Sequence, residues 1–594
     1  MRSRLASTRL AASFVTLVIA ALAGSCLLVS SPAFAARHAD EHLTFHGDGA
    51  RSGWFDAERR LTPARLRAGD FVHLWDSPPL GAAGDVPARL FATPLFVRGV
   101  AIDTTRGTQR HDIVIAASTT GYVAAIAADD RDEQPAGRIL WQRRLTSAAC
   151  GRATYGIVAT PAVDRTRQRL YVSVCDEADG WRIHALSLST GTDAAGSPLH
   201  DLAAQINRPS INRNGDNRFP SGPAGLQRGA LNLTADGKYL LVTFGGEPLS
   251  GWLVGIDTDT LRVASAYSMT PRAEEGNGGL WASGGAAIDA QGRIHLATGS
   301  SVLNALAGMG DGGVYPESAG NWSQSIVSLR FDRAGALTLA GTYTPFNYCQ
   351  VGGTDIDLGS GTPIAIDVRT HGRTQRLLVH TGSKQGNAYL LDRDHMPGSL
   401  VKRQPCEPDL RAGAARDRSL LAPESQPQFG TRGPLNVFGP YSERYGMGDH
   451  ARSRTTPAYF RDQHGRHFVF VTGNAKSAEE SAVDVGPGIA RLEVVTPRAG
   501  PPHLRLDSVN PALVLRNPGS PFVSSNGARA GIVWLTDVNA PRSASLYGPD
   551  APRPVLYALD ANTLDILWRT LPGELHPGGK YNEPAVAGGR VFVG

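Results

Sequence analysis

The chain has 594 residues, of which 41% are hydrophobic, 19% charged and 7% aromatic. Glycine (68) and proline (39) together make up about 18% of it, against an ordinary sum of ~12%, so short elements joined by many turns are expected. This composition excludes a helical bundle, a coiled coil and an acidic disordered chain. The net charge of +5 includes three arginines near the N-terminus, and without them it is too small to indicate a nucleic-acid partner.

The N-terminus has the pattern of an export signal. Three arginines precede an apolar run from Leu10 to Ser30, and small residues in an A-x-A arrangement follow. This pattern is typical of a secretory signal peptide, so we expect residues 1–35 to be removed and the protein to be periplasmic or secreted. A lipoprotein site at Cys26 and a retained membrane anchor are the alternatives. No other long apolar stretch occurs, so no membrane span is expected in the mature chain.

Three histidines follow the expected cleavage point at a spacing of four: His38, His42 and His46. On a helix they would share one face and could bind a metal ion. The alternative is a mobile new terminus that binds nothing.

A weak repeat then runs through the rest of the chain. Each copy opens with small residues, often Thr-Pro, and continues into short runs rich in Val, Ile, Leu and Tyr. The expected openings are Thr93–Phe96, Thr160–Val163, Gly229–Leu231, Gly285–Ile288, Thr362–Ile364, Thr456–Ala458, a degenerate Ser525–Gly527, and Glu583–Val586. Strand groups recurring at this spacing predict propeller blades. We therefore expect residues 36–594 to form one all-β domain, an eight-bladed β-propeller of four-stranded antiparallel blades; a β-sandwich is the alternative.

The sequence does not show directly how the two ends of the repeat region join to close the ring. The last copy stops at Gly594, directly after its second strand. Val72–Trp75 is a candidate outer strand that would join the ends of the ring. One further strand is still missing, so we expect the sequence to be truncated within the last blade.

Without Cys26, four cysteines remain: Cys150, Cys175, Cys349 and Cys406. An oxidising compartment permits disulfides, and the pairs closest in sequence are Cys150–Cys175 and Cys349–Cys406. Four buried thiols are the alternative. No CxxC or CxxCH sequence occurs, which excludes a zinc ribbon and a c-type haem site.

Several segments resemble one family of propellers. Ala558–Trp568 is similar to the A-x-D-x-x-T-G-x-x-x-W motif of quinoprotein (PQQ-dependent) alcohol dehydrogenases, with Leu564 in place of Gly. Gly245–Asp257 and Lys384–Arg393 resemble middle blades of the same superfamily, and Lys580–Val586 is closer to secreted PQQ-binding-like repeat proteins. The resemblance extends from about His42 to the end, and it implies the propeller fold independently of the repeat.

The resemblance also implies a cofactor site at the centre of the ring, where PQQ lies on a Trp beside a Ca²⁺ ion. Carried over by position, the expected metal ligands are Glu247, Ser300 and Asp355. Oxygen atoms are the ligands that Ca²⁺ prefers. The expected cofactor-binding residues are Trp281, as the platform, and Lys384, which would hydrogen-bond the quinone oxygens.

The catalytic base of the family is an aspartate that takes the alcohol proton. Asp355 and Asp357 are equal candidates for this role. Three departures count against an intact site: Ser300 replaces the usual Asn ligand, Trp281 lies about two residues early, and the adjacent-cysteine disulfide of the family is absent.

Two functions therefore stay open. In the first, the protein is an exported PQQ- and Ca²⁺-dependent dehydrogenase that oxidises an alcohol or sugar and passes electrons to a separate acceptor. In the second, it is a non-catalytic propeller that acts as a protein- or polysaccharide-binding scaffold.

Overall fold

A computed structural model describes residues 40–594 apart from several internal segments, and within it residues 41–594 form one unit. The segments outside the described residues are 105–106, 132–134, 246–249, 273–277, 301–318, 347, 349–355, 382, 385, 407–434, 439–452, 474–487, 542 and 582.

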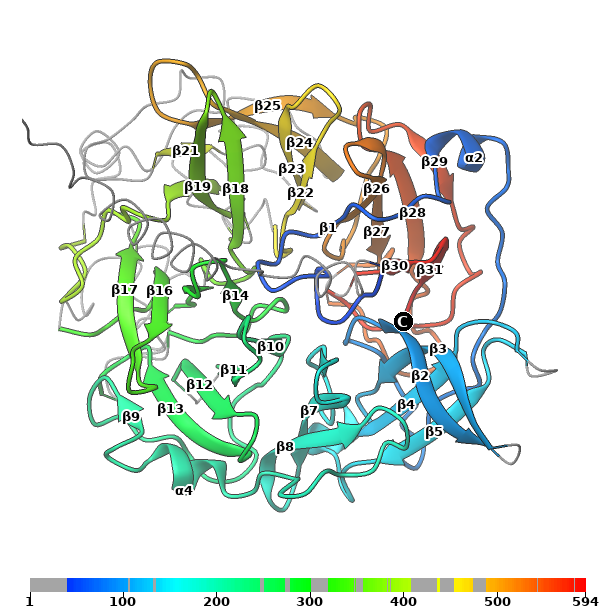
Figure 1. Cartoon of the computed structure of the whole chain (residues 1–594), viewed down its shortest axis with the longest axis horizontal. Coiled ribbons are helices and arrows are strands. Elements are labelled where there is room, and N and C mark those ends of the chain that lie inside the picture. The colour runs from blue at the N-terminus through cyan, green and yellow to red at the C-terminus, as the bar shows by residue number, and fades with distance from the viewer. Residues whose placement is uncertain are drawn as a thin grey trace, which may run out of the picture. The chain divides into compact units, whose positions relative to one another are not determined.

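The unit is an all-β propeller in which antiparallel sheets are arranged around a ring (Figure 1). One four-stranded sheet contains β2 (Leu95–Thr104), β3 (Gly107–Ala117), β4 (Tyr122–Ala127) and β5 (Ile139–Arg144). A second contains β14 (Ala287–Ile288), β15 (Ile294–Ala297), β16 (Ile326–Phe331) and β17 (Leu337–Tyr343). A third contains β18 (Ile364–Thr370), β19 (Arg373–His380), β20 (Ala388–Asp392) and β21 (Asn436–Phe438). A fourth contains β22 (Ala458–Arg461), β23 (His467–Gly473), β24 (Gly488–Val495) and β25 (His503–Val509).

The other sheets depart from four strands. The three-stranded sheet contains β6 (Ala162–Asp164), β7 (Arg169–Asp176) and β8 (Gly180–Ser187). The two five-stranded sheets contain β10 (Asn232–Leu233), β11 (Tyr239–Phe244), β12 (Trp252–Asp257), β13 (Arg262–Ser268) and β9 (Asn212–Arg213); and β1 (Trp54–Phe55), β26 (Phe522–Asn526), β27 (Arg529–Asp537), β28 (Val555–Asp560) and β29 (Ile566–Arg569). A two-stranded sheet contains β30 (Ala585–Ala587) and β31 (Arg590–Phe592).

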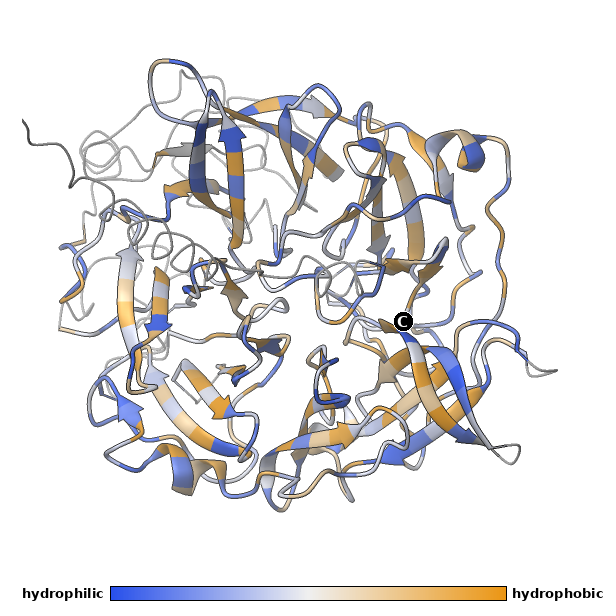
Figure 2. Cartoon of the chain, viewed as in Figure 1, coloured by the Kyte–Doolittle hydropathy of each residue, from blue (hydrophilic) through white to orange (hydrophobic). Residues whose placement is uncertain are grey.

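The helices are short, and the core lies between neighbouring sheets. In the described residues the helices are α2 (Pro63–Arg67), α3 (Cys150–Ala153) and α4 (Leu202–Ile206). Figure 2 shows hydrophobic residues mostly along the strands and hydrophilic ones mostly in the connections. Trp141 of β5, for example, packs with Val163 and Leu186 of the next sheet and donates its indole N–H to Leu188 O at 2.9 Å. Trp141 therefore lies between two neighbouring blades.

The number of blades differs from the expectation. Seven sheets of three or more strands form blades in the described residues, and the last repeat contributes only the hairpin β30–β31. The prediction of eight four-stranded blades is therefore wrong in its count. The segment Val72–Trp75 is not a strand, and Val72 and Leu74 are exposed. An aromatic contact holds this segment instead, since the side chain of Trp75 packs against that of Phe592 with 6.0 Å between the ring centroids.

A physical reason for the Thr in the repeat openings is visible in the structure. Thr93 N donates to Thr160 Oγ1 at 2.9 Å, and the same bond joins the openings of later blades. Those bonds run from Thr362 N to Thr456 Oγ1 and from Thr456 N to Ser520 Oγ. At these three junctions, a hydroxyl of one opening thus links its blade to the previous one. The seventh opening is Ser520–Pro521, and the predicted Ser525–Gly527 lies within and after β26, so that prediction is wrong by five residues.

The first described residues lie along the centre of the ring (Figure 1, dark blue). We call residues 41–53 the axial strap. Its backbone and side chains bond to the start of every sheet in turn: His42 to Phe96, Leu43 to Val163, Thr44 to Leu231, Gly49 to Ile288, Ala50 to Ala365, Ser52 to Tyr459, Gly53 to Val523, and His46 to Glu583. The strap is followed by β1, which pairs in parallel with β26. Segments from both ends of the chain are therefore joined at the axis.

Candidate functional site

Four of the residues expected at the site come from equivalent places in two neighbouring blades. Trp281 precedes β14 and Ser300 follows β15, while Asp357 precedes β18 and Lys384 follows β19. In an antiparallel pair, the start of one strand and the end of the next lie at the same edge. These four residues therefore lie on the same side of the ring, which we call the mouth.

Lys384 and Asp357 form a buried ion pair at the mouth. Lys384 Nζ lies 2.7 Å from Asp357 Oδ2, and both side chains are about one-fifteenth exposed (6% and 7%). The backbone joins them as well, because Lys384 N donates to Asp357 O at 3.0 Å. An ion pair so little exposed is screened weakly by solvent, so its geometry is well defined. Of the two candidate aspartates, Asp357 is the one that lies in the described residues, and this pair orients its carboxylate.

Ser300 completes the environment of this carboxylate through its backbone. Its N–H donates to Asp357 Oδ1 at 2.8 Å. Gly299 allows the close approach, since a Cβ there would lie 2.9 Å from Trp281 Nε1 and 3.0 Å from Asp357 Oδ1. Among the described residues, each carboxylate oxygen therefore has one donor.

Trp281 is partly buried and carries two positive charges near its ring. The Lys384 ammonium lies 5.8 Å from the ring centroid, and the Arg228 guanidinium carbon lies 5.0 Å from it. Arg228 Nε also donates to Trp281 O at 2.9 Å, and the same guanidinium lies 5.0 Å from the ring centroid of Tyr581. Burial lowers the pKa of Arg228 from its ordinary value, although Tyr581 and Tyr155 act in the opposite direction.

Sequence reasoning missed the residues that position the Asp357 loop. Gln324 Nε2 donates to Ile356 O at 2.9 Å, and its Oε1 accepts from Leu358 N at 2.7 Å. The buried His380 bonds through Nε2 to Leu358 O at 2.8 Å. A carbonyl only accepts, so His380 Nε2 carries a proton. Burial lowers the pKa of His380 to about 4, so its imidazole is neutral at physiological pH.

Arg228 and Tyr581 were also missed as site residues. A signal was present for both: Arg228 stands directly before the third repeat opening, and Tyr581 stands two residues before the last. The start of each first strand faces the mouth, so the residue before any opening is a candidate site residue.

The remaining expected ligands fall outside the described residues. These are Glu247 and Asp355. Among the residues that the structure describes, no group of three His, Cys, Asp or Glu side chains is arranged to hold a metal ion. The described donor set at the mouth therefore fits a planar, anionic group better than a cation: it offers an indole face and two cationic side chains, and its one carboxylate is already paired with Lys384.

Two of the three N-terminal histidines lie in the described residues, and neither is on a helix. His38 lies outside the described residues, and His42 and His46 lie in the non-helical axial strap. Both are fully buried beside Glu583, with His46 Nε2 2.8 Å from Glu583 Oε2 and His42 Nε2 3.6 Å from Glu583 Oε1. Tertiary contact with the last repeat, 537 residues away, sets this arrangement.

Cys150 and Cys175 form a disulfide, as the local pairing predicted. The alternative of four buried thiols is therefore wrong. Cys406 is also disulfide-bonded. Cys349 lies outside the described residues.

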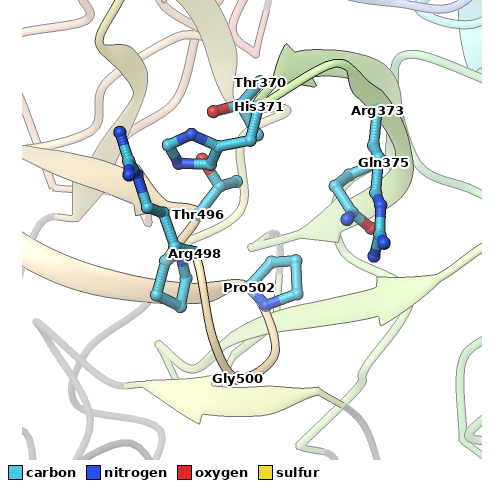
Figure 3. A pocket seen from close by; sticks show the side chains of 9 residues that line it. Thr370, His371, Arg373, Gln375, Thr496, Arg498, Gly500 and Pro502 are labelled. Carbon is cyan, nitrogen blue, oxygen red and sulfur yellow. The ribbon is translucent and has the colours of Figure 1, made fainter.

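A separate hollow of about 500 Å³ lies at the opposite ends of the strands (Figure 3). Its walls come from the β18–β19 turn, with His371 and Arg373, and from the β24–β25 connection, with Thr496 and Arg498. The mouth residues Asp357 and Lys384 stand at the other ends of β18 and β19, so this hollow is not part of the candidate site.

Comparison with known proteins identifies solved structures with a similar fold. No protein-family model and no curated protein sequence matches the chain. The structure is similar to a quinohemoprotein alcohol dehydrogenase from Pseudomonas putida, at a TM-score of 0.53 and 14% identity, over 91% of this chain and 73% of that one. It is also similar to a europium-containing methanol dehydrogenase, at a TM-score of 0.54 and 14% identity, over 91% of this chain and 87% of that one.

Proposed function

We propose that this chain, whose propeller fold resembles that of quinoprotein dehydrogenases, is a PQQ-dependent dehydrogenase that oxidises an alcohol or sugar hydroxyl at the mouth. The observation that carries the proposal is the buried Lys384–Asp357 pair beside the partly exposed face of Trp281. When bound, PQQ would supply a quinone that takes two electrons and two protons from the alcohol, leaving a carbonyl product, and a separate acceptor would reoxidise it.

Trp281 would bind the planar cofactor, and Arg228 and Lys384 would balance its negative charge. Asp357 would accept the hydroxyl proton of the substrate as general base. Two contacts suit Asp357 to that role, because the Lys384 ammonium holds Oδ2 and the Ser300 amide holds Oδ1, and together they fix the orientation of the carboxylate. Asp357 is therefore preferred here over Asp355.

A calcium ion remains part of the proposal, with Glu247, Ser300 and Asp355 as its ligands. One of the similar structures contains europium, another hard cation. Of these three residues, only Ser300 lies in the part of the chain that the structure describes. Its backbone N–H donates to Asp357 Oδ1.

We further propose that the protein is exported to the periplasm or secreted. The signal-like residues 1–35 and the Cys150–Cys175 disulfide both support an oxidising compartment. No helix in the described part of the chain is long and apolar enough to cross a membrane.

The activity is tested with Asp357→Asn, assayed with PQQ, Ca²⁺, a panel of alcohols and sugars, and an artificial electron acceptor. Loss of the general base should lower kcat by about a hundredfold or more while PQQ still binds. Asp367→Asn is the matched control, because Asp367 lies in β18, the strand that follows Asp357, but is exposed and paired with Arg393.

The proposal fails if the wild-type protein binds PQQ but oxidises none of the panel, or if Asp357→Asn and Asp367→Asn turn over equally. A wild-type protein that binds no PQQ would favour the non-catalytic scaffold instead.

A further inference from the structure

The hollow between the β18–β21 and β22–β25 sheets has a lining suited to negatively charged groups (Figure 3). Its volume of about 500 Å³ lies in the range of ~300–1,000 Å³ that is usual for small-molecule sites. Such sites are mostly apolar, whereas this one is lined by basic, hydroxyl and amide side chains together with glycine and proline. None of the described lining residues is acidic. The lining therefore favours a polar, anionic ligand.

The basic side chains of the hollow have no partner within the described part of the chain. His371, Arg373 and Arg498 make no side-chain hydrogen bond and no ion pair there. The acidic residues of β18, β24 and β25 are instead paired with other arginines: Asp367 with Arg393, Glu493 with Arg505, and Asp507 with Arg491. No acidic residue of these strands therefore offsets the charge at the hollow.

One wall of the hollow is a tight hairpin turn that fixes the position of His371. Thr370 pairs directly with Arg373, so the turn between β18 and β19 has only two residues. These are His371 and Gly372, with φ of 49° and 74°. Both angles are positive, as in the turn that most often carries Asn-Gly, and a histidine is uncommon in this conformation. The turn presents the imidazole from a short, well-defined loop.

The other wall is restricted by prolines. Pro497 and Pro502 both line the hollow, and the fixed φ of proline limits the freedom of the chain between β24 and β25. The strands beneath the two walls share one hydrophobic core, which contains Val368 of β18 and Leu504 of β25. The walls are therefore held relative to one another, and little conformational entropy would be lost when a ligand binds between them.

The basic groups stand on two sides of the hollow. Figure 3 shows His371 and Arg498 on one side, and Arg373 with Gln375 on the other. We infer that the hollow binds a small polar molecule that carries two anionic groups, one for each side. A guanidinium donates paired hydrogen bonds to the oxygens of a phosphate or a carboxylate.

The polar part of the ligand between its two charges also has partners. The Thr496 hydroxyl and the Gln375 amide line the same hollow and suit hydroxyl groups of such a molecule. The mouth residues take no part, because they stand at the other ends of β18 and β19. The inference therefore does not rest on the proposed function.

The test is calorimetric titration of the full mature protein at low ionic strength. The first three probes are fructose 1,6-bisphosphate, fructose 6-phosphate and fructose, which differ in the number of phosphate groups. Digalacturonate, which has carboxylates in place of phosphates, is the fourth. The variants are Arg373→Met and Arg498→Met, one from each side of the hollow. Arg369→Met is the matched control, because Arg369 is an exposed arginine of β18 that does not line the hollow.

Fructose 1,6-bisphosphate should bind about tenfold more tightly than fructose 6-phosphate, and fructose should not bind measurably, because each anionic group adds a charge-assisted contact. Arg373→Met and Arg498→Met should each weaken bisphosphate binding about tenfold, to roughly the affinity of the monophosphate. Arg369→Met should match the wild type. Tighter binding of digalacturonate than of the bisphosphate would assign carboxylates to the ligand, and the reverse would assign phosphates; either result upholds the inference.

Three results would overturn the inference. The first is a wild-type protein that binds neither doubly charged probe. The second is fructose 6-phosphate binding as tightly as the bisphosphate, or Arg373→Met and Arg498→Met binding the bisphosphate as the wild type does. The third is equal weakening in Arg369→Met, because general surface charge rather than the hollow would then attract the anion. All three arginines are exposed, and thermal melting confirms that each variant is folded.

Discussion

At the scale of single residues, the site depends on close approach between side chains of two blades. Gly299 separates Trp281 from Asp357, and a Cβ at this position would lie about 3 Å from a polar atom of each. Neither neighbour is free to move: Asp357 is held by Lys384, and Trp281 O accepts from Arg228. A side chain at residue 299 would therefore displace Trp281 or the Asp357 carboxylate.

Gly299→Ala should weaken PQQ binding about tenfold, because overpacking by one methyl group in a tight contact costs roughly 1–3 kcal/mol. Calorimetry against the wild type measures the change. Gly49→Ala is the control, since a Cβ there meets no atom closer than 3.7 Å. Equal affinity of Gly299→Ala and the wild type would show that the contact is irrelevant to the ligand.

Sequence reasoning identified part of this site. Lys384, Asp357, Trp281 and Ser300 were expected from a family pattern, and the structure brings them together. Arg228 was not predicted. It reaches the site from another blade, and a single sequence carries no record of which loops meet across a ring.

At the scale of elements, the axial strap has the widest reach. Its thirteen residues bond to the start of every sheet, yet they have no regular secondary structure and no periodicity. For that reason the sequence offered only a helical metal site or a mobile terminus for the histidines there. The repeat openings were predictable because Thr-Pro recurs, whereas Ser520–Pro521 was missed because Ser replaces Thr at an equivalent hydrogen bond.

Glu583 links the strap to the last hairpin and is fully buried with His42 and His46. His46 Nδ1 bonds to Arg51 O, a carbonyl that only accepts, so Nδ1 carries a proton. His46 Nε2 and Glu583 Oε2 are 2.8 Å apart. Burial acts to raise the pKa of Glu583, but the charge of His46 and the hydrogen bonds of both histidines hold it below the ordinary value.

Glu583→Gln should lower the free energy of unfolding by about 3 kcal/mol at neutral pH, because one partner of a buried pair is lost. In the wild type, the stabilisation from Glu583 is present above the unfolded-state pKa of about 4.5 and is lost as pH falls through the lower folded-state pKa. The difference between variant and wild type should therefore shrink in acid. Denaturant unfolding between pH 3 and pH 7 measures it.

The exposed Glu574→Gln serves as the control for this comparison, since that side chain caps only Leu571 N at the surface. A Glu583→Gln variant as stable as Glu574→Gln at pH 7 would show that the strap does not depend on this pair.

At the scale of the whole molecule, the fold was predictable and the blade count was not. Short β-rich runs at a regular period specify a propeller whatever their exact number. The last repeat supplied an opening and two strands, which sequence counting scored as an eighth, truncated blade. The packing of blades also explains why Leu564 can stand where the family motif has Gly. It adopts φ 64° where the family motif has Gly, but its side chain is fully buried between blades.

The central claim is that the mouth of the ring binds PQQ on Trp281, and calorimetric titration of the mature protein with PQQ, with and without Ca²⁺, tests it most directly. We expect one PQQ per chain with a micromolar or lower Kd, tighter with Ca²⁺, and at least about tenfold weaker binding in Trp281→Ala, since a buried aromatic platform is removed. A folded wild-type protein that binds no PQQ, or a Trp281→Ala variant that binds it equally well, would contradict the account.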